Sequence, residues 1–196
     1  MLTIQEKFKN TKIILASRSP RRQYLLKELG LRFESADNGN EDESYPATLL
    51  KKEIPVYLAL KKSDGFLNLL DKDTLLITAD TIVWCGGQVL GKPDDREDAV
   101  RIIEKISGRK HEVITGVCLR SKQKTTTFHS LTSVFFRHLT GSEIAFYVDN
   151  YRPYDKAGAY GIQEWIGYAG IKKIRGSYFN VMGLPTEKLY KNLIDF

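Results

Sequence analysis

Residues 12–16 (KIILA) form a short apolar run rich in isoleucine, which is typical of a buried strand. The run stops at Ser17, and Pro20 then suits the first turn of a helix that has Ser19 as its N-cap. Apolar side chains within residues 24–29 give that helix one buried face. A strand, a serine-rich turn and a helix in immediate succession predict an α/β unit near the start of the chain.

Further apolar runs predict more strands, and amphipathic stretches predict helices between them. Strands are expected at residues 32–36, 74–79, 111–119, 125–137, 158–163 and 171–174. Helices are expected from Pro55 onward and at residues 95–106, 142–150 and 184–196, with a hairpin at Gly86-Gly87. Because several of these strands read as antiparallel, we predict an α/β or α+β fold with a mixed sheet, split into two lobes around a cleft.

The composition is that of an ordinary globular protein. The chain has 196 residues, of which 42% are hydrophobic and 28% charged, and this excludes disordered, collagen-like and disulfide-scaffold chains. A net charge of +6 suits an enzyme that handles a polyanion. The chain shows no apolar run of about 18 residues and no secretory signal. We therefore expect a cytoplasmic protein, without a membrane segment, whose Cys85 and Cys118 are reduced thiols.

Residues 17–22 (SRSPRR) have the chemistry of an anion site. Free backbone N–H groups at a helix start attract negative charge, and the hydroxyls of Ser17 and Ser19 add donors. Arg21 and Arg22 supply planar donor groups that suit phosphate oxygens. A capped helix whose arginines face solvent would have the same sequence, so both interpretations stay open. No GxxxxGK[ST] motif is present, which argues against a P-loop NTPase.

Asp80 and Thr81 come directly after the apolar run at residues 74–79, where α/β proteins place their chemistry. An acid at this point can bind a divalent cation or take a proton from water, or it can simply cap the next turn. Lys92, in the GKP segment, can pair with Asp80 or neutralise a phosphate, and it also fits an ordinary turn.

Residues 155–163 (DKAGAYGIQ) combine small residues with one amide side chain. Small residues let the backbone approach a ligand closely. The Gln163 amide carries both a donor and an acceptor, which suits the edge of a nucleic-acid base. A glycine-rich bend in a strand is the alternative interpretation.

Six segments together resemble the Maf (septum-formation inhibitor) family of nucleoside triphosphate pyrophosphatases. They run from Ile13 to about Pro185 in the family's order: ILASRSPRRQYLLKELGLRFE, ITADTIVW, GKP, SGRKHEVITGV, DKAGAYGIQ and VMGLP. The resemblance implies one domain over residues 1–196, with an elongated α/β fold and two lobes around a positively charged cleft. It also implies hydrolysis of a nucleoside triphosphate to monophosphate and pyrophosphate with Mg²⁺ or Mn²⁺ as cofactor. A homodimer is compatible with it.

The resemblance also assigns roles to residues of this chain. Asp80 matches the catalytic proton acceptor and, with Glu43, the acids that hold the metal; Glu41 and Asp42 are the neighbouring alternatives to Glu43. The phosphate-binding positions match Ser17, Ser19, Arg21, Arg22, Lys62 and Lys92. The positions that affect substrate choice match Arg21, Thr81 and Gln163. Thr81 after Asp80 resembles the branch that acts on dTTP and UTP, whereas the 7-methyl-GTP branch tends to carry Gln there.

The chain departs from the family pattern after Gln163, where the family usually has Gly and this chain has Glu164 and Trp165. An indole at this point could reshape the base pocket. Two alternative functions stay open. One is the same chemistry on a modified nucleotide such as 7-methyl-GTP. The other is a non-enzymatic nucleic-acid-binding domain that uses arginines as phosphate clamps. No RRM, KH or helix-turn-helix signature is present, so we expect no stable nucleic-acid complex.

Overall fold

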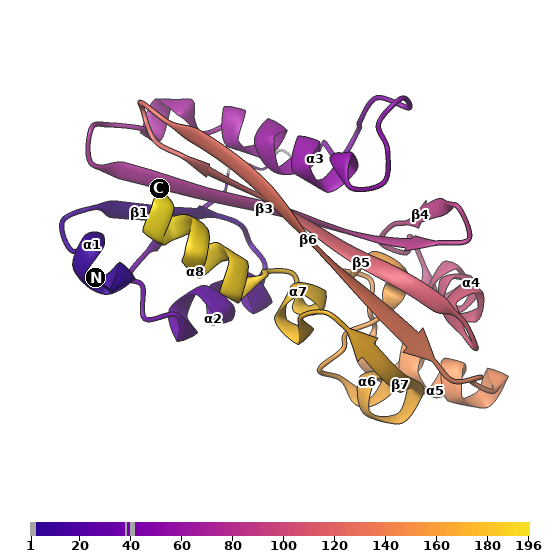
Figure 1. Cartoon of the computed structure of the whole chain (residues 1–196). Helices are drawn as coiled ribbons and strands as arrows, with labels where there is room; N and C mark the ends of the chain where they lie inside the picture. The colour runs from indigo at the N-terminus through magenta and orange to yellow at the C-terminus, as the bar shows by residue number, and fades with distance from the viewer. Residues whose placement is uncertain (1–2, 38, 40–41) are drawn as a thin grey trace. The chain divides into compact units, whose positions relative to one another are not determined.

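The structure is a computed structural model that describes residues 3–37, 39 and 42–196. Within these residues the strands form one mixed sheet of seven, in the order β2-β1-β3-β5-β6-β7 with β4 paired to β3 (Figure 1). The strands are β1 (Lys12–Ala16), β2 (Glu34–Ala36), β3 (Thr74–Cys85), β4 (Gln88–Leu90), β5 (Lys110–Arg120), β6 (Thr125–Phe136) and β7 (Ile171–Arg175). β1 is parallel to β2 and β3, whereas the β3/β4 and β6/β7 pairs are antiparallel. The predicted mixed α/β sheet with flanking helices is confirmed.

Four of the helices begin where the sequence offers a capping side chain. The side chains of Thr3, Ser19, Asp95 and Thr140 each accept a backbone N–H in the first turn of a helix. The helices are α1 (Ile4–Lys7), α2 (Pro20–Glu28), α3 (Glu53–Asp64), α4 (Arg96–Ile106), α5 (Gly141–Tyr151), α6 (Trp165–Gly170), α7 (Tyr178–Met182) and α8 (Thr186–Asp195), with 3₁₀ turns η1 (Leu67–Leu69) and η2 (Ala157–Ala159). In the part of the chain that the structure describes, no helix has the length and apolar character to cross a bilayer.

The chain divides into two compact units. Unit 1 comprises Met1–Asp80, Thr115–Ser130 and Gly183–Phe196, and unit 2 comprises Thr81–Ile114 and Leu131–Met182. The strands β3, β5 and β6 each contribute residues to both units, so neither unit is a continuous stretch of chain.

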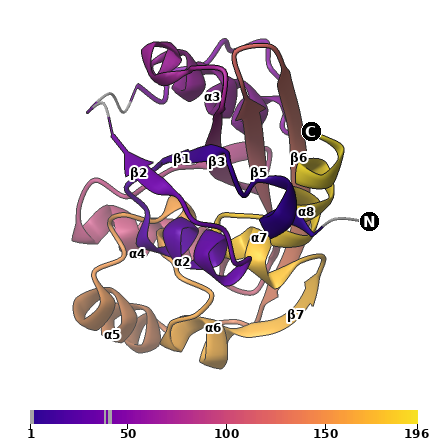
Figure 2. The same cartoon turned by 90° about the vertical axis from the view of Figure 1, so that its left-hand side faces the viewer.

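Unit 1 is built around β1 and the first part of β3. Leu15 and Leu76 are fully buried there, and α1 and α8 pack against each other (Figure 1). α3 lies beside β3 and β5 (Figure 2). The contact with β5 is made by backbone, because a Cβ added to Gly116 would lie 2.3 Å from the carbonyl carbon and oxygen of Pro55. Only glycine allows α3 to approach this closely.

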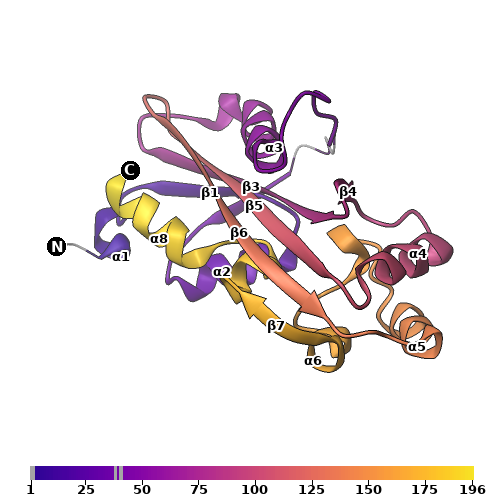
Figure 3. The same cartoon turned by 45° about the vertical axis from the view of Figure 1, so that its right-hand side comes forward.

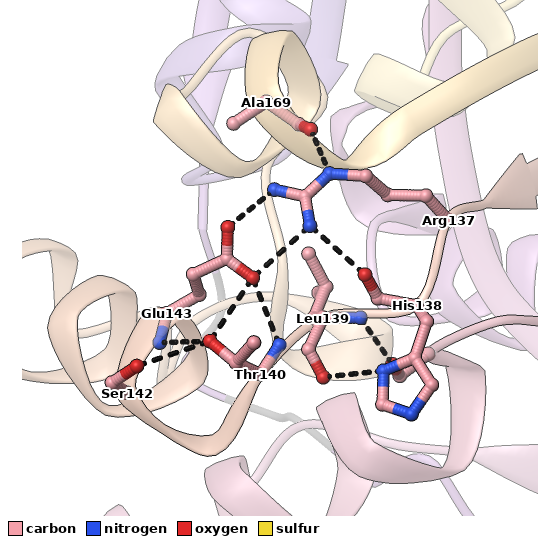
Figure 4. A network of polar contacts seen from close by, with 8 residues as sticks. Arg137, His138, Leu139, Thr140, Ser142, Glu143 and Ala169 are labelled. Atoms are coloured by element: carbon pink, nitrogen blue, oxygen red, sulfur yellow. Dashed lines mark hydrogen bonds and ion pairs between the residues drawn. The ribbon is translucent and has the colours of Figure 1, made fainter.

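Unit 2 has its own hydrophobic core, in which α4 packs against α5 and η2 (Figure 3). The start of α5 is held by Arg137, which Figure 4 shows between Glu143 and the carbonyl of Ala169. The guanidinium donates to Glu143 at 2.6 and 3.0 Å and to Ala169 O at 2.6 Å. The Arg137 hydrogen bond lowers the pKa of Glu143 to about 2, so this carboxylate stays ionised at neutral pH.

Three sequence-based expectations are corrected. The predicted strand at residues 158–163 is wrong, because Gly158 and Ala159 have positive φ angles of 72° and 56° and the segment contains η2 and a turn. β3 does not end at residue 79 but continues through Asp80 and Thr81 to Cys85, so Asp80 is not a turn cap. α3 begins at Glu53 rather than at Pro55, which still leaves the proline in the first turn, where its missing N–H costs nothing. The other predicted strands, the hairpin and the other four predicted helices are confirmed to within a few residues.

Candidate active site

Asp80 is the centre of a charged cluster in unit 1. Its side chain is buried, and the Lys62 ammonium from α3 donates a hydrogen bond to Asp80 Oδ1. The same Nζ lies 3.8 Å from Glu43 Oε1. The hydroxyl of Thr78, two residues before Asp80 on β3, donates to the carbonyl of Ala59 in α3 at 2.6 Å. The face of β3 that carries Asp80 is therefore fixed against the helix that carries Lys62.

Burial dominates the electrostatics of this cluster. It raises the pKa of the Asp80 carboxyl above its ordinary value, Lys62 and Arg22 act in the opposite direction, and Glu43 adds to the rise. Burial likewise lowers the pKa of the Arg22 guanidinium, and the negative charge of Asp80 opposes that change. A buried carboxyl with a raised pKa is suited to accept a proton near neutral pH.

The segment at residues 17–22 is held in one conformation by hydrogen bonds within unit 1. Ser17 Oγ accepts the N–H of Ser19 at 3.2 Å, and Ser19 Oγ accepts the N–H of Arg22 at 3.4 Å. Arg22 Nε donates to the carbonyl of Gly183 at 2.9 Å. Arg18, in contrast, pairs with Asp37 at 3.1 Å. The turn thus combines a helix start with Arg22, whose charge acts on Asp80.

The acidic loop offers three candidates for the second acid. Glu41 lies outside the described residues. Asp42 accepts a hydrogen bond from Lys61 at 2.7 Å and from the Ser44 N–H at 2.9 Å, and the Lys61 bond holds its pKa below the ordinary value. Glu43 instead shares Lys62 with Asp80. The geometry therefore favours Glu43 as the acid associated with the Asp80 cluster.

The donor set at Asp80 and Glu43 is compatible with a divalent cation. Both carboxylates interact with the same positive group, the Lys62 ammonium, so the protein already concentrates negative charge around one point. Across the described ranges no three His, Cys, Asp or Glu side chains gather closely enough to hold a metal by themselves. Proteins commonly bind Mg²⁺ through one or two carboxylates together with water and substrate phosphates, and the pair Asp80 and Glu43 has that chemistry.

The other predicted residues belong to unit 2. Thr81 follows Asp80 on β3, and since successive strand residues point to opposite faces, its side chain points away from the Asp80 face. Lys92 is exposed after β4, next to Gly91, whose carbonyl accepts the N–H of Gly158 at 2.9 Å. Gln163 lies in the turn before α6. Its Oε1 atom is buried and has no hydrogen-bond partner among the described residues.

Three residues around Gln163 were not among the predicted site residues. Tyr147, Lys156 and Glu164 form a buried polar cluster in unit 2. Lys156 belongs to a segment that the sequence analysis quoted, and Glu164 is a noted departure from the family pattern. Tyr147 gives no signal in the sequence, because one tyrosine in an amphipathic helix is an ordinary core residue.

Comparison with known proteins gives consistent results along the chain. A family model described as Maf-like protein matches residues 12–196. A dTTP/UTP pyrophosphatase of Bacteroides fragilis is 50% identical over 182 residues, 93% of this chain and 94% of that protein. Proteins of the same name from Porphyromonas gingivalis and Flavobacterium psychrophilum are 48% and 50% identical, with 97% and 98% of this chain and the same shares of the relatives covered. The chain belongs to the Maf family.

Proposed function

We propose that this protein hydrolyses dTTP and UTP to the nucleoside monophosphate and pyrophosphate. The structural observation that carries the proposal is the buried Asp80 carboxylate, paired with Lys62 and close enough to Arg22 for the two charges to interact. Support for the substrates comes from relatives named dTTP/UTP pyrophosphatase that are 48–50% identical over most of the chain. The proposal includes a cytoplasmic location, in keeping with the two free cysteines.

Asp80 is the proton acceptor in this proposal. Water that attacks the α-phosphorus must lose a proton, and a carboxylate whose pKa is raised by burial accepts it more readily than an ordinary aspartate. A positioned general base contributes about 10²–10⁴-fold to the rate. As the α–β phosphoanhydride bond breaks, pyrophosphate leaves and the proton remains on the carboxyl group.

Positive groups of unit 1 would stabilise the phosphates. Lys62 donates to Asp80, the charge of Arg22 acts on the same carboxylate, and the helix start at Ser19 adds N–H groups. Arg21 and Lys92 are assigned to the same task by the resemblance to the family. Asp80 and Glu43 are the side chains that would hold Mg²⁺ or Mn²⁺, which when bound supplies further charge neutralisation at the phosphate oxygens.

Gln163 is proposed to select the base. Its amide can donate to a uracil or thymine carbonyl and accept the ring N3–H. The buried and unpartnered Oε1 supports this role, because it is an acceptor that needs a donor from outside the described residues. Cytosine has no N3–H and carries an amino group in place of O4, so an amide held in the same orientation would face at least one mismatched partner. Thr81 is small and would leave room beside the ring.

A panel of nucleotides with Mg²⁺ or Mn²⁺ tests the proposal, with monophosphate and pyrophosphate resolved by chromatography. We expect dTTP and UTP to be cleaved well, and CTP and ATP poorly. If 7-methyl-GTP is cleaved faster than both dTTP and UTP, the proposed substrates are wrong but the proposed pyrophosphatase reaction stands. A salt-sensitive nucleic-acid gel shift without pyrophosphate release would instead favour the binding-domain alternative.

A further inference from the structure

Glu164, the residue after Gln163, has both carboxylate oxygens engaged inside unit 2. Its Oε2 accepts a hydrogen bond from the hydroxyl of Tyr147 in α5, and its Oε1 lies 3.1 Å from Lys156 Nζ. The side chains of Lys156 and Glu164 are only 10% and 18% exposed. Burial and Glu164 raise the pKa of Tyr147, so its hydroxyl keeps its proton and remains the donor. The carboxylate is therefore held from two sides.

The same groups close the turn that contains Gln163. The N–H of Gly161 donates to Tyr147 Oη at 3.0 Å, and the N–H of Glu164 donates to the carbonyl of Gly161, also at 3.0 Å. Gly161 itself lies against the carboxylate, since a Cβ there would be 2.6 Å from Glu164 Cδ. The backbone on both sides of Gln163 is thus tied to one carboxylate and one phenol.

Stability alone is a weak reason for this arrangement. Burying an ion pair costs desolvation, and well-packed apolar residues of similar volume often stabilise a protein as well or better. A buried polar cluster does, however, fix one conformation, because each member has its geometric requirements met in only one arrangement. Here the conformation that it fixes is the turn that carries the Gln163 amide oxygen, which has no hydrogen-bond partner in the part of the chain that the structure describes.

We infer that Glu164 is a positioning residue for base selection: with Tyr147 and Lys156 it holds the 161–164 turn so that the Gln163 amide meets the dioxo edge of uracil or thymine. Glu164 does not contact the substrate. The inference rests on the proposed function, and it gives a role to a residue that departs from the family's usual glycine. It predicts that substrate choice depends on Glu164 more strongly than folding does.

The test measures kcat/KM for UTP and for CTP in Glu164→Ala and Glu164→Gln, together with melting temperature. Glu143→Ala is the matched control, because it removes a second partly buried carboxylate from the same unit, one that is paired with Arg137. It loosens the same helix, α5, without touching the turn (Figure 4). We expect Glu164→Ala to lower the ratio of kcat/KM for UTP to kcat/KM for CTP (the UTP/CTP ratio) by about 10-fold or more, because only the value for UTP falls. Glu164→Gln can still accept the hydrogen bond from Tyr147, so its UTP/CTP ratio should fall less.

The control should leave the UTP/CTP ratio unchanged at a similar loss of melting temperature. The inference is overturned, while the proposed function stands, if the UTP/CTP ratio is unchanged in Glu164→Ala. It is also overturned if the ratio falls as much in Glu143→Ala as in Glu164→Ala. Hydrogen exchange of the Gly161 amide gives a readout that does not need activity, and it should accelerate in Glu164→Ala but not in Glu143→Ala. If the wild-type chain cleaves no triphosphate, the proposed function is wrong, and the exchange result alone supports or overturns the positioning role.

Discussion

Gly116→Ala should damage both stability and activity, although residue 116 is not a predicted site residue. A Cβ at this position would lie 2.3 Å from the Pro55 carbonyl and 2.4 Å from the Val56 nitrogen, where contact distances are normally about 3.5 Å or more. Both sides of the contact are backbone, so no side chain can rotate away. α3 must therefore move by about 1 Å, or β5 must bend.

The expected cost is about 3 kcal/mol, the upper end for an overpacked core. For a chain of this size that corresponds to a fall of about 6–12 °C in melting temperature. Lys62 moves with α3, and a displacement of about 1 Å at a catalytic group can cost about 100-fold in rate. Urea unfolding and kcat/KM for UTP measure the two effects.

Gly141→Ala is the control, because a Cβ at Gly141 meets nothing within 4 Å and alanine is the better helix former at the first residue of α5. It should leave the free energy of unfolding unchanged or slightly higher. If Gly116→Ala unfolds with the wild-type midpoint and slope, the close approach of α3 to β5 is wrong, and the argument that positions Lys62 fails with it.

Asp80→Asn should lower kcat by about 10²-fold or more with the fold intact, and wild-type turnover at saturating metal would show that Asp80 is not the base. Because burial raises the pKa of Asp80, turnover should fall as pH drops through that raised value. The contribution of Asp80 to the free energy of unfolding has the opposite pH dependence: it is present at low pH and is lost as pH rises through the folded-state pKa. Urea unfolding at a series of pH values should show this dependence in the wild type but not in Asp80→Asn. Arg21→Ala should lower kcat/KM for UTP far more than it lowers the melting temperature. Arg22→Ala should lower both kcat/KM and the melting temperature, since Arg22 also donates to the carbonyl of Gly183. An equal fall in melting temperature in the two variants would contradict this. Gln163→Ala should narrow the gap between UTP and CTP in kcat/KM without a matching loss for CTP, and an unchanged gap would exclude Gln163 from base selection.

Local signals in the sequence located most of the elements. β1 matches its predicted bounds, and α2 begins where Ser19 and Pro20 predict, because a cap and an N1 proline act within one turn. The strand prediction for residues 158–163 failed because the conformation of this segment depends on residues that are distant in the sequence. Gly158 donates to the carbonyl of Gly91 and packs against Val83, so a left-handed bend replaces the predicted strand.

The site was predictable in its residue types but not in its pairings. The resemblance named Asp80 and Lys62 separately, and only the packing of α3 on β3 brings the ammonium to the carboxylate. The choice of Glu43 over Asp42 likewise depends on which lysine each acid reaches. Tyr147 could not be predicted, since its hydroxyl acquires a role only when α5 lies beside the 161–164 turn.

The contact between Gly161 and the Glu164 carboxylate limits the order in which substitutions can accumulate here. While residue 161 is glycine, residue 164 is able to change between glycine and glutamate. Once Glu164 is present and bonded to Lys156 and Tyr147, any side chain at residue 161 would collide with it. An ancestor that first gained a side chain at residue 161 could not then have acquired this glutamate in its present position. The two positions are therefore epistatic, and a designer who introduces this glutamate into the same turn of another Maf protein must make sure that the position of Gly161 is also glycine.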